Sequence, residues 1–156
     1  MTYEALDVAK YIINYCNKKN YPISNLRLQK LLYFVQASFI QEKNEICFDD
    51  AMHCWAYGPV IPKIYRRYKV YGSTNIPKQS TLIFDDEKKE FDYVDFEFEG
   101  NEEDRKIIEE MVEETKCMSV FALVDITHNQ TPWKKNYDSS KDNEIPIKDM
   151  FKYFRS

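Results

Sequence analysis

Four cysteines and two histidines are the side chains of this sequence whose types most readily do chemistry. Cys47, His53 and Cys54 lie close enough along the chain to raise the question of a metal site. A strong zinc pattern has paired ligands at short spacing that recur later in the chain, whereas His128 stands alone and the cysteines form no C-x-x-C pair. The spacing therefore predicts no metal and no cofactor, and indicates reduced thiols used as small buried side chains.

Nucleophilic catalysis would require a cysteine or serine beside an imidazole base and an orienting acid. His53 and His128 are the two imidazoles available, and neither lies in a recognisable catalytic sequence. Paired acids in this chain are adjacent in sequence, so their side chains would diverge instead of facing each other across a substrate. We therefore predict no catalytic residue and no enzymatic activity. A hydrolase using Cys54 or Cys117 is the least favoured class, because it requires an unusually reactive thiol.

A run of basic and aromatic residues occupies positions 65–71, with the sequence Tyr-Arg-Arg-Tyr-Lys-Val-Tyr. Interleaved cations and rings suit a single-stranded nucleic acid, because cations track the phosphates while rings stack on the bases. At helical spacing, however, the tyrosines point mostly to one side and Lys63, Arg66 and Arg67 to the other. We therefore favour core tyrosines with a basic stripe that faces solvent or a protein, and keep nucleic-acid contact as the less favoured alternative.

The most distinctive motif is the hexapeptide at 55–60, Trp-Ala-Tyr-Gly-Pro-Val. Its two large aromatic residues alternate along an extended segment that should stop at the Gly-Pro pair. One interpretation is that they fill the core where a strand turns into a helix. The other is that they form an aromatic-rimmed surface of the kind that carries most of the binding energy in protein interfaces. The candidate partner-binding residues, with the basic stripe included, are Trp55, Tyr57, Gly58, Pro59, Lys63, Arg66 and Arg67.

These motifs follow an apolar series that predicts a central helix at 25–42, with Ser24 as a suitable N-cap. The apolar positions recur at i, i+3, i+4, i+7 and i+11, which is one stripe of a helix. We expect this stripe and a tryptophan near the end of the chain to form the structural core. The predicted core residues are Leu28, Leu31, Leu32, Val35, Phe39 and Trp133.

The remaining periodic segments predict a mainly α (α+β) fold, a compact bundle of about six helices around the helix 25–42. Thr2 is expected to cap the first helix, and Gly72 to end a helix that begins at Pro62. Asn101 and Ser119 are expected to cap two later helices. A small antiparallel β element is predicted at about 52–57, 81–84 and 93–98.

Length and charge set further limits on this 156-residue chain. One domain, 1–156, is expected. No apolar run approaches the ~18 residues of a membrane span, and no secretory pattern opens the chain, so we expect a cytoplasmic protein without a membrane partner. Positions 1–80 carry a net charge of +5 and positions 81–156 a net charge of −9. Segment 85–114 holds 15 acids against 4 bases and reads either as a mobile excursion or as a docking surface.

Several motifs together resemble the Panacea antitoxin domain family, whose members are also described as SocA-like or GepA-like phage-associated proteins. The resemblance is dense over 5–77 and sparse but ordered over 119–133. It is carried by Leu6-Asp7-Val8-Ala9, by Pro-Ile-Ser-Asn-Leu-Arg-Leu-Gln-Lys-Leu-Leu-Tyr at 22–33, by the hexapeptide with Tyr65-Arg66 and Tyr71-Gly72, and by Thr-His-Asn-Gln-Thr-Pro-Trp at 127–133.

This resemblance implies a mostly helical, non-enzymatic domain of bacteria and their phages. It implies the antitoxin of a two-gene pair, which neutralises by direct contact a protein toxin encoded by the neighbouring gene. Partners differ widely among members, so neither the toxin nor the oligomeric state follows from it. The alternative is a nucleic-acid-binding regulator or a phage accessory protein that acts against a host defence system.

Overall fold

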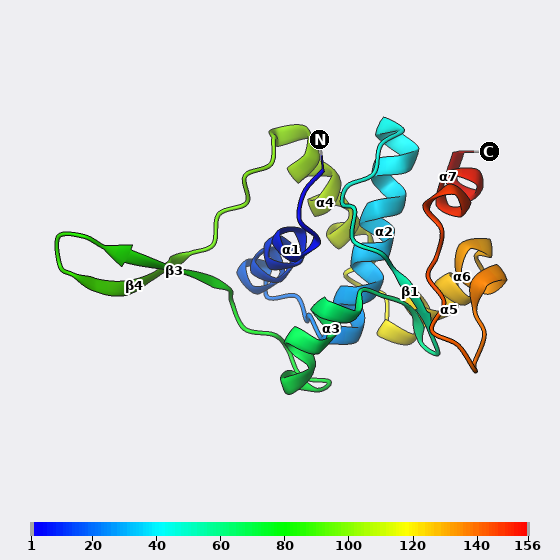
Figure 1. Cartoon of the computed structure of the whole chain (residues 1–156), viewed down its shortest axis with the longest axis horizontal. Coiled ribbons are helices and arrows are strands. Elements are labelled where there is room, and N and C mark those ends of the chain that lie inside the picture. The colour runs from blue at the N-terminus through cyan, green and yellow to red at the C-terminus, as the bar shows by residue number, and fades with distance from the viewer. Residues whose placement is uncertain (1, 156) are drawn as a thin grey trace.

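A long helix, α2 (Asn25–Lys43), runs through the middle of the molecule and is buried along most of its length. The structure is a computed structural model that describes residues 2–155. Figure 1 shows the other helices around α2 and one β-hairpin that projects away from them. The apolar stripe lies inside this body, because Leu28, Leu31, Leu32, Val35 and Phe39 are all buried.

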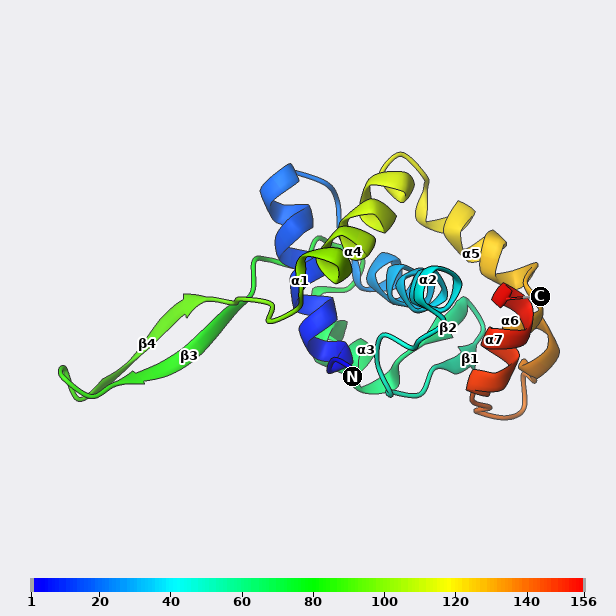
Figure 2. The same ribbon diagram turned by 90° about the horizontal axis from the view of Figure 1, so that it is seen from above.

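Six further α-helices pack around α2 in the described part of the chain (Figure 2). Five of them contact α2 directly, and α6 reaches it through α5 and α7. The mainly α architecture with a small β component is thereby confirmed. None of the helices within residues 2–155 has both the length and the apolar character of a membrane span. The helices are α1 (Ala5–Lys19), α3 (Pro62–Tyr68) with the 3₁₀ turn η1 (Lys69–Tyr71), α4 (Glu102–Thr115), α5 (Val120–His128), α6 (Thr131–Asn136) and α7 (Ile147–Arg155).

Side-chain caps begin three of these helices where the sequence predicts them. Ser24 accepts a hydrogen bond from the Arg27 amide at 3.2 Å, and Asn101 and Ser119 make the same kind of bond at α4 and α5. Each bond satisfies an amide that would otherwise lack an acceptor in the first turn. The cap predicted at Thr2 is wrong, because α1 begins at Ala5 and the Thr2 hydroxyl instead donates to Asp49 at 3.2 Å.

The β residues form two separate two-stranded hairpins instead of one shared element. Strand β1 (His53–Trp55) pairs with β2 (Gly58–Val60), and β3 (Ser80–Asp85) pairs with β4 (Glu90–Asp95). Strand β1 lies within the strand predicted at about 52–57, but the sequence did not predict the returning strand β2. The chain reverses at 56–57 because Gly58 has φ +105°, a backbone conformation that favours glycine, and the Gly-Pro pair begins the returning strand. The strand predicted at 93–98 lies earlier, at 90–95.

Buried polar side chains on α2 hold the irregular segments that surround it. The Gln29 side chain accepts a hydrogen bond from the Ile61 amide at 2.9 Å. The Gln36 side chain accepts one from the Cys47 amide at 2.7 Å and donates to the Phe48 carbonyl at 2.9 Å. Because buried polar groups must be paired, these bonds fix where the segments before and after the first hairpin lie against the helix.

Candidate functional site

The hexapeptide 55–60 forms the tip of the first hairpin, and β2 packs against α2 and α5. Lys30 of α2 fixes this tip from below, because its ammonium group donates to the Pro59 carbonyl at 2.6 Å. A Cβ atom added at Gly58 would lie 2.6 Å from the Thr127 hydroxyl oxygen and 2.9 Å from Cε of Lys30. Position 58 therefore requires glycine both for its backbone conformation and for the close packing beneath it.

Lys30 is unusual because its side chain is 0% exposed and forms no salt bridge in residues 2–155. Burial lowers the pKa of Lys30 to about 7, since a charged ammonium group is disfavoured away from water. Periodicity missed this residue, because it marks apolar positions only and Lys30 is a charged residue between them. The sequence feature that could have identified Lys30 is a lysine that lies between apolar positions of the helix expected at the centre of the bundle.

The motif at 127–133 packs directly on the hexapeptide, through residues that are more than seventy positions apart in the sequence. The Trp133 indole donates to the Trp55 carbonyl at 3.0 Å, and Nε2 of His128 lies 3.0 Å from the Ala56 carbonyl oxygen. The His128 and Trp133 rings stack with their centroids 4.1 Å apart. Trp133 is buried, so it supports the tip of the hairpin from within the core.

A groove of about 510 Å³ opens beside the hairpin tip, where α2 begins and where α3, η1 and α5 approach it. Trp55 and Tyr65 meet edge to face across it, with ring centroids 5.1 Å apart. Tyr57 and Phe121 stand at its rim with 61% and 62% of their surfaces exposed. We name this surface the aromatic groove, and its apolar lining consists of Leu26, Trp55, Ala56, Tyr57, Val60, Tyr65, Val120 and Phe121.

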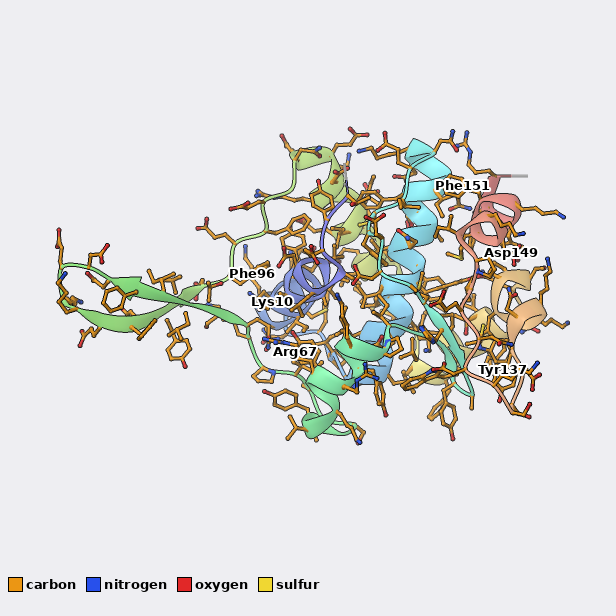
Figure 3. The ribbon with its side chains drawn as sticks, viewed as in Figure 1. Lys10, Arg67, Phe96, Tyr137, Asp149 and Phe151 are labelled. Carbon is orange, nitrogen blue, oxygen red and sulfur yellow. The ribbon has the colours of Figure 1, made fainter. Side chains whose placement is uncertain are left out.

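Basic residues of α3 and η1 flank the aromatic groove. Lys69 contributes to its lining, and Arg66 and Arg67 are exposed on α3. Lys63 is neutralised by Asp50 at 2.5 Å, and the Arg67 guanidinium lies over the Tyr68 ring (Figure 3). Within residues 2–155, Arg66 and Lys69 form no salt bridge. The positive charge of this stripe therefore remains available beside the groove.

The structure brings some of the predicted partner-binding residues together and separates others. Trp55 and Tyr57 line the groove, and the Trp55 indole also donates to Asp142 at 3.0 Å. Gly58 and Pro59 are buried beneath it, so they shape the groove without lining it. Sequence reasoning missed Phe121, because no local pattern shows that the first turn of α5 reaches the hairpin.

Three of the four thiols, those of Cys16, Cys47 and Cys54, are buried as predicted, whereas Cys117 is exposed. The Cys54 thiol is buried and points to the Trp133 carbonyl at 3.8 Å, and burial raises its pKa to about 11. Burial likewise raises the pKa of Cys47. Nδ1 of His53 lies 2.9 Å from a carboxylate oxygen of Asp142. Across residues 2–155, no three histidine, cysteine or acidic side chains gather in an arrangement that could hold a metal ion.

Comparison with known proteins relates this arrangement to a family. Residues 28–134 match the family described as antitoxin SocA-like, Panacea domain. This range contains most of α2, most of the aromatic groove and the motif that ends at Trp133, and it begins just after Leu26 of the groove lining. The chain is also similar to Antitoxin SocA of Caulobacter vibrioides (strain NA1000 / CB15N), with 36% identity over 69 residues.

That alignment covers 44% of this chain and 37% of the relative, so the chain matches well under half of the relative's length. No solved structure matches the chain. The family match, in contrast, spans more than half of the sequence, including the hexapeptide 55–60 and the motif at 127–133. The protein therefore belongs to the SocA-like Panacea antitoxin domain family.

Proposed function

We propose that this protein is a cytoplasmic antitoxin that neutralises a protein toxin by direct contact, and that the toxin is the product of the neighbouring gene. Family membership supports the antitoxin role. The observation that carries the contact is the aromatic groove, in which exposed rings stand beside Arg66 and Lys69, two cations without a salt bridge in the part of the chain that the structure describes. Tyrosine, tryptophan and arginine are the residues that dominate binding energy at protein interfaces.

The hydrogen bonds beneath the groove favour a docking surface that is already ordered before a partner binds. Lys30 and Trp133 hydrogen-bond the two carbonyls at Pro59 and Trp55, so the hairpin tip is held from below. A surface that is ordered before binding loses less conformational freedom on association. A toxin that presents an apolar side chain beside an acidic patch would fit this groove and its basic stripe.

A non-enzymatic role is part of the proposal. The Cys54 thiol has a pKa raised by burial and points to a backbone carbonyl, which makes it a poor nucleophile. Nδ1 of His53 lies 2.9 Å from a carboxylate oxygen of Asp142, and within residues 2–155 this imidazole forms no hydrogen bond to a thiol or hydroxyl. Neutralisation would then follow from occupying the toxin's surface.

Nucleic-acid binding has narrower support. Tyr65 and Lys69 both line the groove, which puts one ring beside one cation. Tyr68, however, is buried in the core. A stacking platform needs successive exposed rings along a charged track, whereas the rings of this surface gather around one groove and Lys69 is the charged residue in its lining.

The test is co-expression of this chain with the neighbouring gene product, with growth and co-purification as readouts. We expect the toxin alone to stop growth, and the pair to grow and co-purify as a stable complex. Tyr57→Ala with Phe121→Ala should weaken the complex by about tenfold or more. The matched control is Ile147→Ala, which removes an exposed apolar side chain on α7, outside the groove. A harmless neighbour that does not co-purify would contradict the proposal.

A further inference from the structure

The hairpin formed by β3 and β4 projects from the helical body in both views (Figures 1 and 2). We name residues 80–95 the arm. Its root is anchored, because the buried Phe98 ring stacks on Tyr11 at 4.9 Å and Lys10 lies 5.3 Å from the Phe96 ring centroid (Figure 3). Beyond this root, the two strands leave the body.

One face of the arm is apolar and lies in solvent. The register pairs Leu82 with Tyr93 and Phe84 with Phe91, and cross-strand partners at alternate positions share a face. The exposed fractions are 50% for Leu82, 73% for Tyr93, 47% for Phe84 and 67% for Phe91. An isolated two-stranded hairpin is only marginally stable in water, and a contiguous apolar patch of this kind marks an interaction site.

The charge of the arm identifies which surface would cover it. Residues 80–95 hold six acids and two lysines, a net charge of −4. The α3 and η1 residues 62–71 hold Lys63, Arg66, Arg67 and Lys69 and no acid, a net charge of +4. This basic segment borders the aromatic groove, so one chain carries an acidic apolar arm and a basic apolar groove. The strands of the arm point away from the body, so the arm does not cover the groove of its own chain (Figures 1 and 2).

We propose that the arm of one molecule docks its apolar face over the aromatic groove and basic stripe of a second copy. The contact is reciprocal, so a two-fold dimer makes it twice. Phe84, Phe91 and Tyr93 have 47–73% of their surfaces left to bury, out of the roughly 150–250 Å² that an aromatic side chain buries in full. Two arms and the surfaces they cover then reach the range of about 1,200–2,000 Å² typical of a stable interface. Two arms packed face to face would instead bring like charges together.

This inference concerns the free protein and does not depend on the toxin. It shares the aromatic groove with the proposed function, so a second arm and a toxin would compete for one surface. Oligomeric state tests the inference, whereas growth rescue tests the proposed function. Failure of one is therefore distinguishable from failure of the other.

Sedimentation equilibrium of the full chain, from about 1 to about 200 µM, measures the dimer dissociation constant. We expect a wild-type dimer that weakens between about 50 mM and about 500 mM NaCl, because exposed charges are screened. Phe84→Ser with Phe91→Ser should raise the dissociation constant by about tenfold or more. The matched control is Ile83→Ser, on the same strand but the opposite face, which should leave the dimer intact.

A charge exchange keeps the test decisive if serine disturbs the arm itself. Arg66→Glu with Lys69→Glu changes the groove, and Asp86→Lys with Asp95→Lys changes the arm. Each variant alone should be largely monomeric. Their mixture should form heterodimers more tightly than either variant self-associates, because one native arm then meets one native groove. A monomeric wild type, or a dimer indifferent to both sets of changes, would overturn the inference. A monomer whose arm variants lose only toxin binding would also overturn it, and would assign the arm to a basic toxin.

Discussion

The aromatic groove and the arm both expose large rings, but the two surfaces are stabilised in opposite ways. The groove lies on the helical body, where Lys30 and Trp133 hold the hairpin tip and α2 lies beneath. The arm has its own ladder of strand hydrogen bonds and an anchored root. The comparison indicates that the groove is ordered before binding, whereas the arm gains stability from whatever covers it.

The largest difference in stability is expected between a substitution in the helical body and one in the arm. Leu32→Ala removes a fully buried side chain of α2 and should lower the free energy of unfolding by about 2–5 kcal/mol. Leu82→Ala removes the same atoms from the exposed face of the arm and should change it by less than about 0.5 kcal/mol. Urea denaturation of dilute protein measures both, and equal losses would contradict the distinction.

The next effect concerns the support beneath the groove. Gly58→Ala forces a Cβ atom against Thr127 and Lys30 at φ +105°, and should lower the free energy of unfolding by about 2–4 kcal/mol. Gly72→Ala is the matched control, because its φ is +57° and a Cβ atom there would meet nothing within 4 Å. It introduces backbone strain alone, with φ +57° and ψ −129°, and should cost about 1–3 kcal/mol, less than Gly58→Ala under the same conditions. Thermal denaturation compares the two variants, and a tolerated Gly58→Ala would show that the hairpin tip is not tightly held.

Lys30, which lies beneath the groove, should make the free energy of unfolding depend on pH, and the arm should not contribute to this effect. Its pKa of about 7 lies below the ordinary value of 10.5, so above pH 7 the unfolded chain binds a proton that the folded chain does not. Stability therefore rises with pH in this window. Relative to Lys30→Met, the free energy of unfolding of the wild type should rise by roughly 2 kcal/mol between about pH 7 and 8.5. Lys63→Met is the control at an exposed lysine. A difference in the free energy of unfolding between wild type and Lys30→Met that stays constant with pH would contradict this expectation.

The smallest effect on stability should come from the basic stripe. Arg66→Glu with Arg67→Glu changes two exposed side chains and should alter the free energy of unfolding by less than about 0.5 kcal/mol. The same change should weaken toxin binding by about tenfold or more, since it reverses the charge beside the groove. Isothermal titration with the neighbouring gene product measures the affinity. Unchanged binding would remove the stripe from the interface.

Local patterns predicted the helices well because their signals are local. The apolar spacing of α2, the caps at Ser24, Asn101 and Ser119, and the Pro62 start of α3 each depend on residues within a few turns. The first hairpin was missed because a Gly-Pro pair usually ends a strand, whereas here φ +105° at Gly58 reverses the chain.

The groove could be predicted only in part. Trp55 and Tyr57 were visible as an unusual aromatic pair, but Phe121 joins them through tertiary packing. Periodicity marks apolar positions, so it also overlooked the polar side chains of α2 that bind the loops, such as Gln29 and Lys30. Such contacts link residues about thirty positions apart, beyond the reach of a helical or strand period.

Hydrogen exchange of this chain with and without the neighbouring gene product tests the central claim most directly. The account predicts that binding protects the segments that form the aromatic groove, which are 55–57, 65–69 and 120–121. Protection confined to other surfaces, or no protection when the toxin is present in excess, would contradict it.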